Sequence, residues 1–291
     1  MIENEGSSEK RIVTIFDDIY NLPDCRDYFR AMYDAGFRTA HHAANAFRRV
    51  RDDLARTRDL ESLNILDFAS GYGIAAALMR HDLTLDDVLE RYRDPEFDAA
   101  TPEEVMARDR EWYAAHRRGG NNDRFVGIDI ADLALRYGVE AGVFDAAYAE
   151  NLQAADPGEE LRAWLAECDL VVECGSVAHM LPDALDRVLG AAVGRRPWVI
   201  TAPIRGNDTA AAIKVMHDHG LVVEVLDMPP FRHRRFADAQ EQARAIANAR
   251  ARGHATDGVE STGYFHAQLY LGRPEDEATA LRGRRVTPGL G

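Results

Sequence analysis

The stretch that decides the fold is LNILDFASGYGIAAALM, residues 63–79. Its first seven residues form a short apolar run interrupted by Asp67, and the run ends in a turn that contains Gly71 and Gly73. Alanine-rich sequence follows, so the pattern predicts a strand, a tight turn and a helix. Glycines at such a turn let the backbone approach a ligand, and the next helix offers free N–H groups. The stretch therefore predicts a binding turn, although a glycine turn that only packs helix on strand has the same pattern.

Further strand and helix patterns alternate along the rest of the chain. Strands are expected at 124–130, 146–152, 169–174, 198–202, 221–226 and 264–271, and helices at 133–141, 182–192 and 208–219. A basic and then helical stretch, 231–253, separates the last two strands. Alternation of this kind predicts an α/β fold, with a doubly wound, mainly parallel sheet covered by helices on both faces.

The segments outside this alternation have patterns of their own. Residues 1–11 form a polar tail that we expect to be mobile, and 12–58 have helical periodicity, which predicts an N-terminal helical lid. Thr84 and Thr101 each precede acidic residues as helix N-caps do, which predicts two inserted helices within 81–122. We therefore expect one α/β domain, 59–275, that includes this insertion, followed by a C-terminal tail, 276–291.

Composition excludes several classes of function. The chain has 291 residues and a net charge of −14, whereas nucleic-acid binding depends on Lys and Arg that neutralise phosphates. No apolar run approaches the roughly 18 residues needed to span a bilayer, and the N-terminal residues are polar. We therefore expect a cytoplasmic protein with neither a nucleic-acid nor a membrane partner. The sequence leaves the oligomeric state open, including a homodimer.

A second motif, FVGIDIA at 125–131, ends a strand in Asp129. A carboxylate at the tip of the strand beside the glycine turn is well placed to accept both hydroxyls of a ribose, although it could also cap the next helix. The glycine turn also fits the dinucleotide pattern G-x-G-x-x-G/A, in which the acid follows about 20 residues later. Asp129 lies 56 positions after Gly73. Because the insertion explains the gap for either ligand, spacing does not decide between them.

Four motifs together resemble those of class I S-adenosylmethionine-dependent methyltransferases. They are the acid and small-residue loop at 67–73, the acid motif at 127–131, the loop at 149–152 and the strand and loop at 169–181. The resemblance covers about 63–275 and implies a class I methyltransferase-like Rossmann fold with a seven-stranded sheet. In that fold, 264–271 is the antiparallel strand inserted beside the last parallel one.

The resemblance also implies a cofactor, S-adenosylmethionine, and a site for it. Gly71 and Gly73 would approach the methionine part, Asp67 would support its amino group, and Asp129 would hold the ribose. Glu150 or Asn151 would read the adenine. Arg38, between the two N-terminal helices, is the candidate for the cofactor carboxylate, with an exposed or capping arginine as the alternative. Three more residues adjoin the second and fourth motifs and complete the predicted cofactor site: Ile130, Cys174 and Gly175.

The acceptor side has weaker signals. His179 follows the fourth strand and is the candidate base for an acceptor that must lose a proton, although a histidine there is also a common cap or packing residue. The basic run FRHRRF, 231–236, makes Arg232 and His233 candidates for an anionic acceptor, with a solvated loop as the alternative. Tyr28 and His41 would line the lid or pack in the core. No histidine spacing predicts a metal site.

The predicted function is therefore methyl transfer from S-adenosylmethionine to a small, anionic metabolite, which leaves S-adenosylhomocysteine as product. Three other functions stay open. The same site could use the other electrophilic carbon of the cofactor in alkyl transfer or cyclisation, it could belong to an NAD(P)-dependent oxidoreductase, or it could bind a cofactor without turnover.

Overall fold

An eight-stranded sheet forms the centre of the protein. The computed structural model describes residues 19–120, 122–175, 181–278 and 283–285. The sheet has the strand order β10-β6-β9-β5-β4-β1-β2-β3, and β1 to β6 run parallel while β9 and β10 run antiparallel to them. The strands are β1 Asn64–Phe68, β2 Arg124–Asp129, β3 Ala146–Ala149, β4 Leu170–Glu173, β5 Trp198–Thr201, β6 Leu221–Leu226, β9 Tyr270–Pro274 and β10 Gly283–Arg285.

This topology confirms the predicted fold class. Seven strands, β3-β2-β1-β4-β5-β9-β6, have the order and directions implied by the resemblance to class I methyltransferases, and β10 adds an eighth at the edge. The predicted antiparallel strand at 264–271 was wrong in its bounds. Its first half, Tyr264–Ala267, is β8 of a separate two-stranded sheet, and β9 begins only at Tyr270. The two apolar halves were read as one run because Gln268 and Leu269, which leave the ladder, are not turn residues by type.

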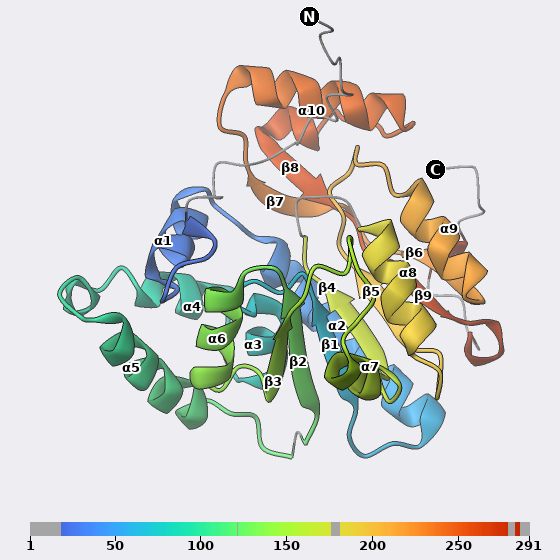
Figure 1. The fold of residues 1–291 in the computed structure, drawn as a ribbon. Helices are drawn as coiled ribbons and strands as arrows, with labels where there is room; N and C mark the ends of the chain where they lie inside the picture. The colour runs from blue at the N-terminus through green and yellow to red at the C-terminus, as the bar shows by residue number, and fades with distance from the viewer. Residues whose placement is uncertain (1–18, 121, 176–180, 279–282, 286–291) are drawn as a thin grey trace, which may run out of the picture.

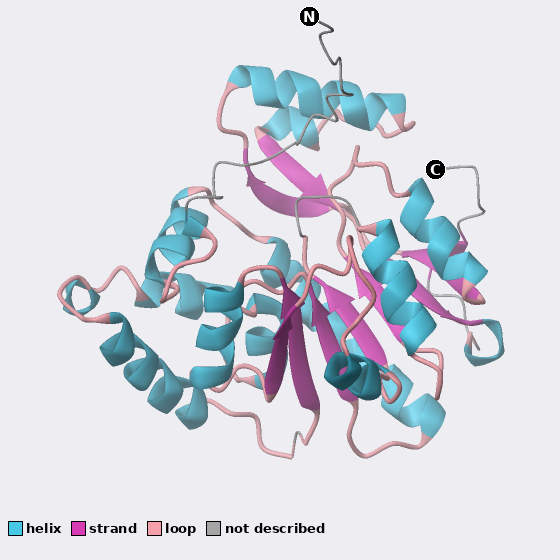
Figure 2. Cartoon of the chain, viewed as in Figure 1, coloured by secondary structure: helices cyan, strands magenta, loops and turns pink. Residues whose placement is uncertain are grey.

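Helices cover both faces of the sheet (Figure 2). On one face, α2, α3 and α6 share an apolar cluster with inward residues of β1, β2, β4 and β5. On the other face, α7, α8 and α9 share a second cluster with the alternate residues of the same strands. These helices are α2 Thr39–Arg58, α3 Ile74–Arg80, α6 Asp132–Glu140, α7 Glu159–Leu165, α8 Pro182–Ala191 and α9 Ala210–Asp218. Only α7 had no counterpart among the expected helices.

The predicted N-terminal lid, 12–58, divides into two parts in its described residues. Helix α2 lies in the main helical layer, where Phe47, Val50 and Leu54 are buried in the cluster that covers β1 and β4. Helix α1, Arg26–Asp34, contacts α4 of the insertion instead. Phe29 and Met32 of α1 are also buried in the cluster, so both helices contribute to this face of the core.

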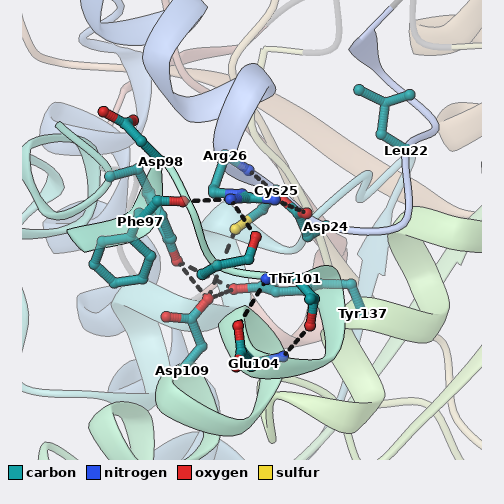
Figure 3. Close-up of polar contacts among 12 residues, drawn as sticks. Leu22, Asp24, Cys25, Arg26, Phe97, Asp98, Thr101, Glu104, Asp109 and Tyr137 are labelled. Atoms are coloured by element: carbon teal, nitrogen blue, oxygen red, sulfur yellow. Dashed lines mark hydrogen bonds and ion pairs between the residues drawn. The ribbon is translucent and has the colours of Figure 1, made fainter. Parts of the chain in front are cut away.

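The insertion contains the two predicted helices, α4 Leu85–Arg91 and α5 Pro102–Ala115, and a 3₁₀ turn, η2 Pro95–Phe97. Both helices begin with the capping box that the sequence predicted, at Thr84 and Thr101. The buried carboxylate of Asp109 in α5 joins this insertion to the rest of the protein (Figure 3). It accepts hydrogen bonds from Arg91 and Tyr92 of the insertion and from Tyr137 of α6.

A small cap follows β6 and lies at the top of the view in Figure 1. It consists of β7 Phe231–Arg235, helix α10 Ala239–Ala251, a 3₁₀ turn, η3 Glu260–Thr262, and β8. The alternative interpretation of the basic run 231–236 as a solvated loop is wrong, because the run is largely strand β7 and Arg234 forms a buried ion pair with Glu241. In the described part of the chain, no helix combines the length and apolar character needed to cross a membrane.

Candidate functional site

The carboxyl ends of β1, β2 and β4 meet at the point where the sheet reverses its winding order. Strand β1 lies between β2 and β4, so the chain passes to opposite sides of β1 when it enters β2 and β4. In open α/β sheets this crevice is where ligands bind. The glycine loop follows β1, Asp129 ends β2, and Cys174 and Gly175 follow β4. The structure therefore brings the predicted motifs to one edge.

Two glycines shape the loop after β1 for different reasons. Gly71 and Gly73 have φ values of 50° and 77°, in the left-handed region that favours glycine. A Cβ atom on Gly73 would lie 2.6 Å from the ring of Phe144, so packing alone explains this glycine. A Cβ atom on Gly71 would instead lie 2.6 Å from the hydroxyl of Tyr20. A side chain would therefore collide with the N-terminal segment at Gly71 and with the core at Gly73.

Asp67 points from the end of β1 to the beginning of α3. Its Oδ2 atom accepts a hydrogen bond of 3.1 Å from the backbone N–H of Ala76, in the first turn of that helix. The side chain is buried, and burial raises the pKa of Asp67 well above its usual value, helped by the negative charges of Glu173 and Asp129. The protein's own carboxylate thus occupies the positive end of α3, and a nearby cation would stabilise its charged form.

Asp129 links the second motif to the first. Its Oδ2 accepts from the N–H of Gly71 at 2.8 Å and from the hydroxyl of Tyr20 at 3.4 Å. Its Oδ1 accepts from the N–H groups of Ile130 and Ala131. The alternative role as N-cap of α6 is wrong, because Ala131 is the N-cap residue. The carboxylate is instead built into the glycine loop.

Three further residues of the predicted cofactor site lie at the ends of β2 and β3. The side chain of Ile130 is 71% exposed, and its predicted place in the cofactor site stays a prediction. Glu150 accepts a hydrogen bond from the N–H of Gly158 at 2.8 Å, and Asn151 accepts one from Gln153 at 3.2 Å. Both polar side chains thus stabilise the loop after β3, and their predicted contact with adenine stays a prediction.

The loop after β4 touches both the N-terminal helices and the cap. Gly175 has a φ of 69°, and a Cβ atom there would lie 3.0 Å from Thr39 and 3.4 Å from Nδ1 of His233. Burial and the charges of Glu173 and Asp67 raise the pKa of Cys174 well above its usual value, so this side chain is a neutral thiol. His179, the predicted base, lies outside the described residues.

The residues predicted for the acceptor have different environments. His233 is buried, its Nδ1 lies 2.6 Å from the hydroxyl of Thr39, and burial lowers its pKa to about 3, which keeps the ring neutral. Arg232 is exposed and lies over the ring of Tyr264. His41 is exposed beside His42.

Two further predicted residues face other parts of the protein. Arg38 forms an ion pair with Asp86 of α4, so its guanidinium is engaged by the insertion rather than placed freely for a cofactor carboxylate. Tyr28 packs against the rings of Tyr20 and Tyr72, and burial raises its pKa. Tyr28 thus packs against the core beside the glycine loop, and its role as a lid residue stays a prediction.

Asn21 accepts a hydrogen bond from the backbone of Leu133, 112 positions away, and the backbone of Leu22 is bonded to the hydroxyl of Tyr72, 50 positions away. Thr39 was read only as a helix start, although its hydroxyl contacts His233. No local pattern marks such pairs, because each partner has an ordinary residue type for a turn or a helix end.

Comparisons with known proteins give only distant likenesses. Neither a protein-family model nor a curated protein matches the chain. It is similar to the solved structure of a TehB-like SAM-dependent methyltransferase from Corynebacterium glutamicum, with 14% identity, 79% of this chain and 97% of that chain covered, and a TM-score of 0.35. It is also similar to geranyl diphosphate C-methyltransferase from Streptomyces coelicolor, with 13% identity, 73% and 71% covered, and a TM-score of 0.34. The fold assignment rests on the strand order and directions given above.

Proposed function

We propose that this protein is a methyltransferase that uses S-adenosylmethionine and acts on a small acceptor. The observation that carries the proposal is the position of Asp67, whose carboxylate accepts the N–H of Ala76 at the beginning of α3. In dinucleotide-binding folds the diphosphate of the cofactor takes this helix N-terminus. Here an anionic diphosphate would have to displace a buried carboxylate or lie against it. The site therefore favours a nucleoside that has no phosphate groups.

Charge supports the same ligand. Three carboxylates, those of Asp67, Asp129 and Glu173, end neighbouring strands, and their mutual repulsion contributes to the raised pKa of Asp67. A ligand with positive charge relieves this repulsion, whereas NAD(P) would add to it. S-adenosylmethionine has both an ammonium group and a sulfonium, and it supplies an electrophilic methyl group when bound. Asp67 would face the ammonium, and Asp129 the ribose.

The rest of the predicted cofactor site fits this arrangement as a proposal. Gly71 would approach the ligand through its backbone beside Asp129, and the exposed side chain of Ile130 would pack on the adenine. Glu150 and Asn151 lie at the end of the next strand, where an adenine amino group would be read. Gly175 and Cys174 would border the methyl group. Arg38 could reach a carboxylate only by leaving Asp86.

The acceptor would bind between the cap and the α1–α2 turn. Strand β7 is fixed to this turn by two backbone hydrogen bonds, from Arg38 to His233 at 2.6 Å and from Arg235 to Ala35 at 2.9 Å. These two segments would then cover the acceptor, which favours a small molecule over a macromolecule. Within the basic run, Arg234 and Arg235 have protein partners, so Arg232 is the cation left to bind an anionic acceptor. His179 is proposed as the base.

Calorimetric titration tests the cofactor. We expect S-adenosylhomocysteine to bind with micromolar affinity and NAD and NADP to show no binding. Asp129→Ala should weaken the binding of S-adenosylhomocysteine by about 1–3 kcal/mol, the cost of removing a charged hydrogen-bond acceptor. Asp218→Ala, which removes an exposed carboxylate in α9, is the matched control. Binding of NAD instead would overturn the argument from Asp67.

Product analysis tests the reaction. After incubation with S-adenosylmethionine and a panel of small carboxylic acids, we expect S-adenosylhomocysteine and a methylated acid. Methylthioadenosine as the nucleoside product would mean that another carbon of the cofactor is transferred. Tight binding without turnover of any acceptor would instead indicate a binding protein.

A further inference from the structure

We infer that residues Tyr20–Leu22 form a detachable strap that closes the nucleoside site, and that its opening sets the rate at which the nucleoside leaves. The inference rests on the proposed function, because it assigns the strap to that site. The strap crosses the glycine loop and the beginning of α6, and three side chains hold it there.

The first anchor is Asn21, which caps a helix far from it in sequence. Helix α6 begins after Ala131, whose side chain cannot accept a hydrogen bond. The Oδ1 atom of Asn21 accepts from the N–H groups of Leu133 at 2.8 Å and Ala134 at 3.3 Å, and its Nδ2 donates to Asp132 at 2.9 Å. An Asn side chain in this role satisfies N–H groups that the helix itself leaves free.

The second anchor is Tyr72, which lies inside the glycine loop between Gly71 and Gly73. Its hydroxyl accepts from the N–H of Leu22 at 2.9 Å and donates to the carbonyl oxygen of the same residue at 3.1 Å. The strap is thus attached to the loop that would contact the ligand. A shift of either one is transmitted to the other.

The third anchor is Tyr20, which lies over the ligand side of Gly71. Its ring makes an edge contact with Tyr28, and its hydroxyl is 3.4 Å from Oδ2 of Asp129. That carboxylate already accepts three backbone N–H groups, and a carboxylate has about four acceptor positions. A ribose hydroxyl that binds Asp129 would share Oδ2 with the hydroxyl of Tyr20, so the closed strap would lie against the ligand. The ligand and the strap would therefore contact the same atom, Oδ2 of Asp129.

The strap can open because each of its hydrogen bonds to the rest of the protein involves a side chain, whereas its base has further contacts with the insertion. Among the described residues, no backbone–backbone hydrogen bond joins Tyr20–Leu22 to the rest of the protein, and Asn21 is exposed. The base begins directly after Pro23. The guanidinium of Arg26 donates hydrogen bonds to the carboxylate of Asp24 and to the carbonyl oxygen of Phe97 in the insertion (Figure 3). We therefore expect motion to be confined to the few residues before this base.

The dissociation rate of S-adenosylhomocysteine, measured by stopped-flow displacement, tests the strap. Asn21→Ala should raise this rate about five-fold, since loss of a cap of this kind costs about 1 kcal/mol. Tyr20→Ala should raise it by a similar factor without removing the cap of α6. Asn248→Ala, an exposed position on α10 remote from the site, should leave it unchanged. Unchanged dissociation in both strap variants would overturn the inference.

Hydrogen exchange gives a second readout that does not depend on turnover. In the wild-type protein, the amides of Leu133 and Ala134 should exchange more slowly once S-adenosylhomocysteine is added, because a closed strap keeps Asn21 in place. The Asn21→Ala variant should lose this protection. Protection that persists in the variant would contradict the role of Asn21. Failure of the wild-type protein to bind the nucleoside at all would instead overturn the proposed function, so the two failures are distinguishable.

Discussion

Replacing Asp109 with alanine should remove the joint between the insertion and the sheet-bound helices. The carboxylate is fully buried and accepts from Nε of Arg91 at 2.9 Å, from the hydroxyl of Tyr92 at 3.0 Å and from that of Tyr137 at 2.7 Å. These partners come from α4, the residue after it and α6. One substitution therefore breaks contacts among segments that are far apart in sequence.

The expected cost follows from the partners that remain. Removing one member of a buried ion pair costs about 3–5 kcal/mol, and the side chain of Arg91 is 16% exposed, which places the cost toward the lower value. The two phenols lie 3.1 Å apart, so one can accept from the other and only one hydroxyl loses its acceptor, at about 1 kcal/mol. We expect Asp109→Ala to lower the free energy of unfolding by about 4 kcal/mol.

Urea denaturation followed by far-UV circular dichroism measures this loss. Lys214→Ala is the matched control, because it removes an exposed ion pair between Lys214 and Asp218 and should cost at most about 0.5 kcal/mol. Asp109→Asn, which keeps an acceptor for the phenols but not the charge, should fall between the two. A loss below about 1 kcal/mol for Asp109→Ala would refute the view that this carboxylate fixes the insertion.

Three further predictions concern stability and turnover. Burial lowers the pKa of His233 to about 3, so between about pH 6.5 and 3 the unfolded chain binds one more proton than the folded protein. The free energy of unfolding should therefore decrease as the pH is lowered, by about 1.4 kcal/mol per pH unit in this range. His233→Asn should lose this part of the slope in urea titrations at pH 6 and pH 4; equal slopes would contradict a buried neutral ring. Gly73→Ala should cost about 2–4 kcal/mol in the same assay, since its φ is 77° and a Cβ atom would lie 2.6 Å from Phe144; wild-type stability would show that the loop relaxes. His179→Ala should slow methyl transfer without changing the affinity for S-adenosylhomocysteine, and an unaltered rate would exclude it as base.

The parts of the fold that the sequence predicted are those set by local pattern. Apolar runs of four to six residues followed by glycine and alanine identify β1 and its helix, and the two threonines identify the inserted helices. Strand β7 was not predicted, because three arginines and a histidine in five residues are typical of a solvated loop. Its burial depends on Glu241, six residues beyond the strand, and on the rings of Phe37 and Phe265. Partners of this kind exist only in the folded chain.

The candidate site divides in the same way. Asp67, Gly71 and Asp129 were predicted together because each ends a strand or forms a turn, and parallel strands bring such ends to one edge. Arg38 was chosen for its charge and its place between two helices, and the structure gives that charge to Asp86. The sequence places Arg38 between two helices but does not show which carboxylate it meets. Asp86, its partner, lies in the insertion, and no sequence pattern indicates that contact.

The proposal of S-adenosylmethionine rather than NAD(P) rests on one local contact, because the spacing of the motifs fits both ligands. The glycine turn fits both patterns, and the insertion makes the distance to Asp129 uninformative. A helix N-terminus with free N–H groups would attract a phosphate, but Asp67 already accepts from Ala76 in the first turn of α3. The backbone at Gly71 can still approach a ligand closely, but the carboxylate of Asp67 disfavours an anionic one. An acid placed four residues before a glycine turn therefore changes the ligand class that the same turn can bind.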